Sequence, residues 1–169
     1  MAEDQQPAQP GPAENPAGQQ QGATFQIEKI YVKDLSLEIP HAPQVFAEQL
    51  QPQIDVNIDT GSTRFADGFF EVTVAVTVTA RAGERTLFLA EAVQAGIFQL
   101  RNVPEADLAP LLGIACPNVL FPYARETISD LATRGGFPAL LLAPISFEQL
   151  YVQRLQQQQG GGAPREAAS

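Results

Sequence analysis

The sequence contains one cysteine, Cys116, and one histidine, His41, among 169 residues. A single cysteine excludes a disulfide within the chain and a zinc site built on several thiolates. Cys116 lies between Ala115 and Pro117, and we expect a small buried apolar side chain there, with a reactive thiol as the alternative. His41 lies in a proline-flanked turn and is expected to be a solvated loop histidine. A Ser-His-Asp or Cys-His site would have to use it, so the sequence argues against nucleophilic catalysis.

Nucleotide-binding motifs are also absent, because neither GxxxxGK[ST] nor GxGxxG occurs in the chain. Carboxylate pairs such as Asp55 and Asp59 lie on one face of a predicted strand, where acidic side chains are ordinarily solvated. We therefore expect no bound cofactor, no metal site and no enzyme activity.

No apolar run approaches the roughly 20 residues that a membrane-spanning helix needs. The first segment has no apolar stretch behind a basic start, so we expect no signal peptide and a cytoplasmic protein. Residues 1–23 and 159–169 are rich in Gln, Pro, Ala and Gly, with few large apolar side chains to offset the entropy cost of ordering. We expect these segments to be disordered tails around one folded domain at 24–158.

Basic residues are scarce, since 10 Lys and Arg stand against 19 Asp and Glu, for a net charge of −9. Residues 24–158 alone carry nine basic and fifteen acidic side chains. An acidic folded region argues against nucleic acid as a partner, because phosphate contacts need a basic face. The charge fits either a basic protein partner or solubility alone.

Alternation of apolar and polar residues predicts four strands before residue 100. The first, Phe25–Glu38, has apolar residues on both faces because Ile30 and Val32 break the alternation. The others are expected at 54–59, 70–80 and 86–98, with a turn region at 60–68 and a short hairpin at 82–85. A long connection follows the first strand. The predicted fold class is therefore α+β, a four-stranded antiparallel sheet with a long crossover after strand 1, followed by two helices.

Residues 116–151 contain the two predicted helices. The first begins near Pro117 and ends at Gly135-Gly136, because glycine adopts the left-handed C-cap conformation without a Cβ clash. An extended apolar arm follows at 137–144, where prolines at both ends argue against a helix. The second helix begins at Ser146, which forms a capping box with Gln149.

These elements carry more apolar surface than two helices can cover. Apolar residues occur on both faces of the first and fourth strands, in the crossover and in the arm. Large exposed apolar patches mark interaction sites. The residue pattern therefore indicates oligomerisation, apolar ligand binding, or both.

Several stretches of the chain resemble the SecB family of protein-export chaperones. They are FQIEKIYVKDLS at 25–36, VTVTA at 76–80, GIFQL at 96–100 and CPNVLFPYARETISDLATRGGFPALLLAPISFEQLY at 116–151. The resemblance implies a homotetramer, a dimer of dimers in which first strands pair across subunits and the long helices pack between the sheets. It also implies that the subunit contacts involve Ala90, Ala92, Gln94, Leu120, Ala124, Ile128 and Leu131.

The resemblance further implies a chaperone that works without ATP. It would bind unfolded preproteins, keep them competent for translocation and deliver them to the motor SecA. The implied client-binding groove consists of Phe46, Leu50, Ile54, Val56, Ile58, Phe137, Leu141, Phe147 and Tyr151. Many members have tryptophan where this chain has Leu50, which changes the aromatic part of the groove. The implied SecA-binding residues are Asp34, Glu38, Leu89 and Glu91, and the zinc of that contact belongs to SecA.

Two other classes of protein remain compatible with the residues. An α+β module for a small apolar ligand would saturate with one ligand per subunit, whereas a chaperone binds many unfolded chains. An enzyme of hot-dog-like architecture would need a buried carboxylate beside a helix N-terminus, and the sequence does not require one.

Overall fold

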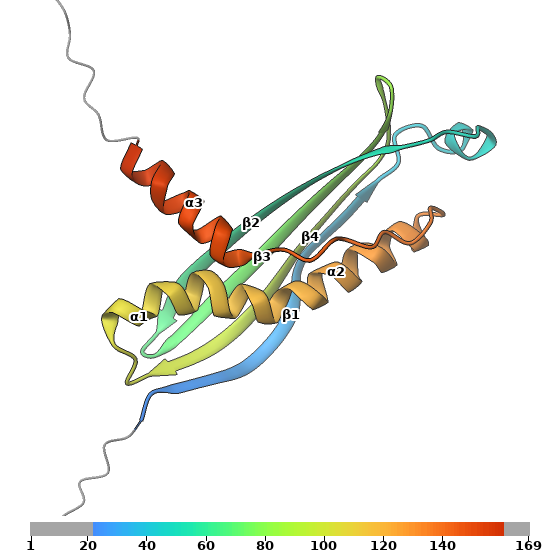
Figure 1. The fold of residues 1–169 in the computed structure, drawn as a ribbon. Helices are drawn as coiled ribbons and strands as arrows, with labels where there is room; N and C mark the ends of the chain where they lie inside the picture. Colours follow the sequence, from blue (N-terminus) through green and yellow to red (C-terminus); the bar gives the residue numbers. More distant parts are fainter. Residues whose placement is uncertain (1–21, 161–169) are drawn as a thin grey trace, which may run out of the picture.

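The computed structural model describes residues 22–160 and contains a four-stranded antiparallel sheet in the order β1-β4-β3-β2 (Figure 1). The strands are β1, Thr24–Glu38, β2, Gln53–Ala66, β3, Phe69–Ala82, and β4, Arg85–Arg101. The crossover between β1 and β2 contains a short 3₁₀ helix, η1, at Gln44–Ala47. It connects opposite edges of the sheet, which confirms the predicted α+β arrangement with a crossover after the first strand.

The turn region predicted at 60–68 is wrong, because β2 pairs with β3 as far as Ala66, with one register shift between Arg64 and Ala66. Thr60 pairs with Val74 and Ser62 with Val72, so the small polar residues extend the strand. They are tolerated there because β2 is an edge strand with one side toward solvent. The turn is confined to residues 67–68, where Gly68 has a φ of +70°.

Two register shifts explain why β1 looks apolar on both faces in the sequence. They lie between Ile27 and Lys29 and between Val32 and Asp34. Each extra residue reverses which face the following side chains occupy. The shifts bring Phe25 and all the larger aliphatic residues of β1 to the face that α2 covers farther along the sheet. The prediction of a strand with two apolar faces is therefore wrong. They pair with residues of β4 in the order Phe25–Leu100, Ile27–Phe98, Ile30–Gly96, Val32–Gln94, Leu35–Ala92 and Leu37–Ala90.

The first helical segment begins earlier than predicted. Helix α1, Glu105–Pro110, passes through a π-helical turn, η2, Leu111–Ala115, into α2, Cys116–Arg134. Pro117 has no N–H to donate to the carbonyl of Gly113, which removes an α-helical hydrogen bond next to the π turn. The residues that predicted a helix start at Pro117 therefore mark an irregularity inside a longer helical run.

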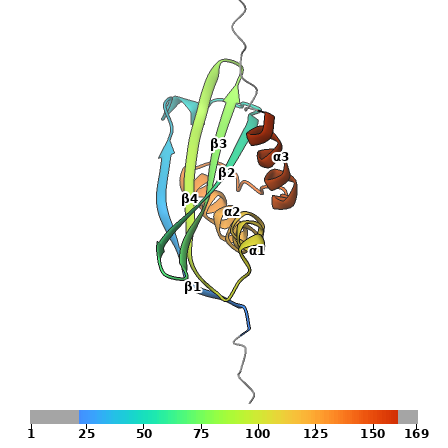
Figure 2. The same ribbon diagram turned by 90° about the vertical axis from the view of Figure 1, so that its left-hand side faces the viewer.

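Helix α2 lies across one face of the sheet (Figures 1 and 2) and forms the core with β3 and β4. Gly96 makes the close approach possible, because a Cβ there would lie 2.8 Å from Cδ2 of Leu120. Full burial stabilises each large aliphatic side chain by roughly 1.5–3 kcal/mol relative to exposure. The side chains of this interface with no exposed surface include Leu120, Ala124, Ile128, Val72, Val74, Val78, Ala90 and Phe98.

Helix α2 ends as predicted at the glycine pair. Gly136 has a φ of +84° and its N–H donates to the carbonyl of Thr133 (3.0 Å), while the N–H of Phe137 donates to the carbonyl of Ala132 (3.1 Å). These two bonds form a Schellman motif that satisfies the last carbonyls of the helix. The predicted arm at 137–144 has no helix or strand.

Helix α3, Phe147–Gly160, begins at the predicted cap and extends two residues beyond the predicted domain end at 158. The backbone N–H of Gln149 donates to Oγ of Ser146 (3.3 Å), which confirms the capping side chain. Most of the predicted tails, at 1–21 and 161–169, lies outside the described residues.

Candidate functional site

An aromatic cluster joins the crossover to the start of the arm. The ring centroid of Phe137 lies 4.6 Å from that of Phe88 on β4 and 5.4 Å from that of Phe46 in the crossover. Phe46 is 51% exposed, so the outer side of this cluster is open to solvent. Arg85 holds the crossover in place through hydrogen bonds of 3.0 and 2.8 Å from Nη1 to the two carboxylate oxygens of Glu48. The structure therefore places Phe46 and Phe137, two of the residues predicted for the client-binding groove, next to each other.

Neighbouring residues of the arm have opposite environments. Leu142 is 7% exposed and packs into the core, whereas Leu141 is 84% exposed. An extended segment alternates its side chains between two sides, so burying Leu142 turns Leu141 outward. Leu50, at the end of the crossover, is half-buried against the core.

The apolar face of the sheet continues onto β2 without a covering helix in the described residues. Ile54, Val56 and Ile58 pair with Ala80, Val78 and Val76, which are buried. Ile54 and Val56 are exposed and Ile58 is half-buried. We call Phe46 and these three residues of β2 the crossover groove. Leu141 instead lines a hollow with Pro122, Arg125 and Ser129 of α2.

Phe147 and Tyr151 of α3 lie in different environments. Phe147 is 1% exposed and contacts Phe121 of α2 edge-on, with ring centroids 5.8 Å apart. It belongs to the core and supports α3 from below, so its predicted position in the lining of a groove is wrong. Tyr151 is half-buried, and its ring lies against Gly113 of η2.

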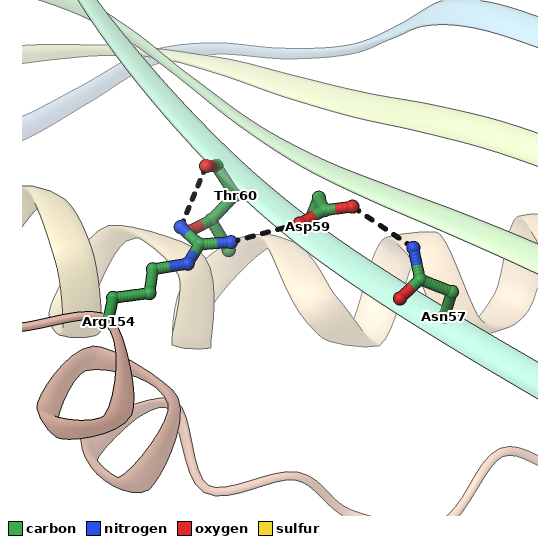
Figure 3. A network of polar contacts seen from close by, with 4 residues as sticks. All are labelled: Asn57, Asp59, Thr60 and Arg154. Atoms are coloured by element: carbon green, nitrogen blue, oxygen red, sulfur yellow. Dashed lines mark hydrogen bonds and ion pairs between the residues drawn. The ribbon is translucent and has the colours of Figure 1, made fainter. Parts of the chain in front are cut away.

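A second hollow, of about 340 Å³, lies between β2, η2 and α3. Its wall includes Gly61, Leu112, Gly113, Leu150, Tyr151 and Arg154. Across it, Arg154 donates from Nη1 to the backbone carbonyl of Thr60 (2.9 Å) and from Nη2 to Oδ1 of Asp59 (3.2 Å), as Figure 3 shows. Sequence reasoning missed these contacts, because it placed Thr60 in a turn and because the partners are separated by more than ninety residues.

The predicted acidic residues gather on the opposite face of the sheet. Glu38 pairs with Leu89, and Ser36 pairs with Glu91 and donates to its carboxylate (3.5 Å). Asp34 lies farther along the same face of β1, opposite Val93. The structure therefore brings Asp34, Glu38, Leu89 and Glu91 together on one face.

A fourth carboxylate on this face, Glu71 of β3, is already paired. Lys33 donates to Glu71 Oε2 (2.6 Å) and the hydroxyl of Tyr31 donates to Oε1. These hydrogen bonds lower the pKa of Glu71, chiefly through Lys33, and the bond to Glu71 raises the pKa of Tyr31. Glu71 therefore differs from the three predicted acids in being neutralised within the chain.

A family model described as "Preprotein translocase subunit SecB" matches residues 18–158 of the chain. The chain belongs to the SecB family. The "Protein-export protein SecB" of Chromobacterium violaceum is 62% identical over 140 residues, which cover 82% of this chain and 93% of that protein. The protein of the same name from Methylobacillus flagellatus is 53% identical, with coverage of 86% and 92%. These relatives confirm the resemblance found in the sequence.

The SecB fold is also found in a solved structure. It is described as the Mycobacterium tuberculosis Rv1957 SecB-like chaperone in complex with a ChAD peptide from the Rv1956 HigA1 antitoxin. The two chains superpose with a TM-score of 0.61 at 20% identity, over 72% of this chain and 91% of that one. This similarity supports the fold of the SecB-family chain described above.

The residues predicted at SecB subunit contacts are buried inside a single chain. Leu120, Ala124, Ile128 and Leu131 face the chain's own sheet and belong to its core, as do Ala90 and Ala92. Gln94 is also buried; its Nε2 donates to the carbonyl of Tyr31 (2.9 Å), and its Oε1 accepts a bond from Oγ1 of Thr127 (3.4 Å). Any influence of these residues on assembly must therefore be exerted through β1 and α2. A free edge remains at β1, where Phe25, Ile27, Val32 and Leu35 are exposed.

The remaining chemistry of the described residues is limited. Burial raises the pKa of the Cys116 thiol to about 12, so the thiolate that reacts is disfavoured. Within residues 22–160, no three His, Cys, Asp or Glu side chains are grouped as metal ligands. No helix in this range is long and apolar enough to cross a membrane.

Proposed function

We propose that this protein is an ATP-independent cytoplasmic chaperone that binds unfolded preproteins in the crossover groove and keeps them competent for translocation. The observation that carries the proposal is a set of exposed apolar side chains, Phe46, Ile54, Val56 and Leu141, beside a well-packed core. Burial of apolar surface contributes about 25 cal/mol per Å² of favourable binding free energy. It depends little on the sequence of the bound polypeptide. An unfolded polypeptide exposes the apolar side chains that this surface can bury.

We propose that delivery uses the acidic face. Asp34, Glu38 and Glu91 share one face of the sheet with Leu89, and Glu71 on the same face is paired with Lys33. A face of this charge attracts a basic partner segment, which fits SecA as the acceptor.

We also propose a homotetramer, a dimer of dimers, that begins at the β1 edge. An edge strand presents unpaired backbone groups, and the exposed apolar residues of β1 lie directly beside them. A second copy pairing there would cover both. The exposed side of α2 would then be available for contact between dimers.

Light scattering of the purified protein, with and without an unfolded export-competent polypeptide, tests this proposal. We expect a mass near four subunits and a larger complex with the unfolded polypeptide, but not with its folded form. A monomer that ignores unfolded chains would contradict the proposal and favour a small-ligand module.

A further inference from the structure

Arg154 binds the backbone of an edge strand. Its Nη1 donates to the carbonyl oxygen of Thr60 (2.9 Å) and to Thr60 Oγ1 (2.5 Å), and its Nη2 donates to Asp59 Oδ1 (3.2 Å). Asp59 is held from its other side, because Asn57 Nδ2 donates to Oδ2 (3.0 Å) (Figure 3). Thr60 therefore directs its carbonyl away from β3 and toward α3.

The orientation of Thr60 fixes that of its neighbours along β2. In an antiparallel edge strand, alternate residues direct their N–H and C=O groups outward. No register shift interrupts β2 between Gln53 and Arg64, so Ile54, Val56 and Ile58 have the same orientation as Thr60. The side chains of these three residues are the ones that line the crossover groove. The outward backbone groups and the apolar side chains of β2 thus border the same groove.

The outer part of α3 is held weakly. Phe147 anchors its first turn in the core, and Tyr151 contacts Gly113. Val152 and Leu155 are exposed, and the residues after Arg154 are exposed as far as they are described. The ion pair between Arg154 and Asp59 is partly solvated, and such pairs contribute little to stability. The polar attachment of this part of α3 to β2 therefore depends on the hydrogen bonds from Arg154 to Thr60.

We propose that Arg154 is a latch: it holds α3 on the β2 edge, and an extended segment of an unfolded client displaces it by adding to that edge as a strand. This inference rests on the proposed chaperone function and names how the client's backbone is bound. An added strand needs the carbonyl of Thr60 as an acceptor, so it competes directly with Arg154 for one atom. The sequence of β2 permits the addition, because Gln53–Ala66 contains no proline.

An unfolded polypeptide is the occupant that fits this edge. Strand addition gives affinity through main-chain hydrogen bonds and uses alternate side chains for contacts on one face. An unfolded client offers both free backbone groups and exposed apolar side chains that can lie beside Ile54, Val56 and Ile58. A folded protein keeps most of its backbone groups paired and therefore offers few segments that could add along the edge.

The test compares Arg154→Ala with Arg134→Ala in the full chain. Arg134 is an exposed arginine with an ion pair of its own, to Asp130 on α2, so the control removes the same charge and an equivalent surface contact. Hydrogen exchange of the α3 amides measures the latch without a client. We expect Arg154→Ala to raise their exchange rates about two- to tenfold, on the scale of the net contribution of a hydrogen bond, and Arg134→Ala to leave them unchanged. Equal rates in all three proteins would overturn the latch.

Client binding is then measured with a reduced, unfolded polypeptide and each protein. We expect Arg154→Ala to accelerate association by a similar factor, and Asp59→Asn, which keeps the bonds to Thr60, to have a smaller effect. We also expect bound client to protect the amides of Ile58 and Thr60 from exchange. Slower association in Arg154→Ala, or a bound client that leaves these amides unprotected, would overturn the inference. Wild-type protein that binds no unfolded polypeptide would instead refute the chaperone function, while the exchange of α3 would still decide whether Arg154 is a latch.

Discussion

The ring of Tyr151 lies directly over Gly113, where a Cβ would be 2.5 Å from its Cδ2. Gly113 belongs to the π turn η2 and Tyr151 to α3, so this contact joins the long helical segment to the last helix. The absence of a side chain at Gly113 is what allows the ring to approach the backbone.

Gly113→Ala should therefore loosen α3. The methyl group forces the Tyr151 ring away, and overpacking of this kind costs about 1–3 kcal/mol, partly offset by the higher helix propensity of alanine. We expect faster hydrogen exchange in α3 and little change in the sheet. Tyr151→Ala should loosen α3 less in the Gly113→Ala background than it does in the wild-type protein. Strict additivity of the two effects would show that the clash does not occur.

Substitutions at Leu141 and Leu142 should separate effects on client binding from effects on stability. Leu142→Ala leaves a cavity in the core and should cost about 2–5 kcal/mol in the free energy of unfolding, measured by urea denaturation at fixed protein concentration. Leu141→Ala removes an exposed side chain and should change stability by less than about 0.5 kcal/mol. It should nevertheless weaken binding of an unfolded polypeptide. Unchanged binding in Leu141→Ala would exclude this residue from the client-binding surface.

Gln94→Leu should destabilise the edge of the sheet. The substitution leaves the carbonyl of Tyr31 without the donor that Gln94 provides, and an unsatisfied buried group costs about 1–3 kcal/mol. We expect the earliest increase in hydrogen exchange in β1. Thr127→Val is a suitable control, because it removes the longer bond at 3.4 Å and leaves the bond to Tyr31 intact.

The pairing of Glu71 predicts a pH dependence of stability. Lys33 and Tyr31 hold the pKa of Glu71 below its ordinary value of 4.5. A carboxyl whose folded pKa is lowered stabilises the protein above its unfolded pKa and loses this contribution as the pH falls through the folded value. The difference in unfolding free energy between wild type and Glu71→Gln should therefore be largest near neutral pH and shrink below about pH 4.5. Glu84→Gln, at the exposed β3–β4 turn, provides the control; a difference that grows toward low pH would contradict the assignment.

The acidic face should govern SecA binding but not client binding. Asp34→Asn combined with Glu91→Gln removes two charges from one face of the sheet, and solvated ion pairs are each worth about 0.2–1 kcal/mol. We expect SecA affinity to fall several-fold and its salt dependence to weaken, as measured by titration calorimetry at two ionic strengths. Glu126→Gln, an exposed substitution on α2, should leave both unchanged. Unaltered SecA affinity in the double variant would exclude this face as the docking surface.

Several features of the fold could be predicted from the sequence because they depend on local patterns. Alternation identified β3, the glycine pair identified the end of α2, and Ser146 identified the start of α3. The resemblance to the SecB family added the acidic residues, which the structure places together on one face.

Other features could not be predicted because pairing between distant residues decides them. The register of β1 depends on two extra residues that only β4 can reveal. Thr60 becomes part of a strand because Val74 pairs with it, and Phe147 enters the core because Phe121 lies above it. Arg154 meets Thr60 only when α3 folds back over the sheet.

The two register shifts in β1 also affect what can pair with its free edge. Each shift adds a residue, bends the strand and increases its local twist. A straight strand cannot follow such an edge over its full length without losing hydrogen bonds, whereas a strand with matching bends can. The shape of this edge therefore favours a second copy of the same strand and protects the protein against indiscriminate edge-to-edge aggregation, although its surface is apolar.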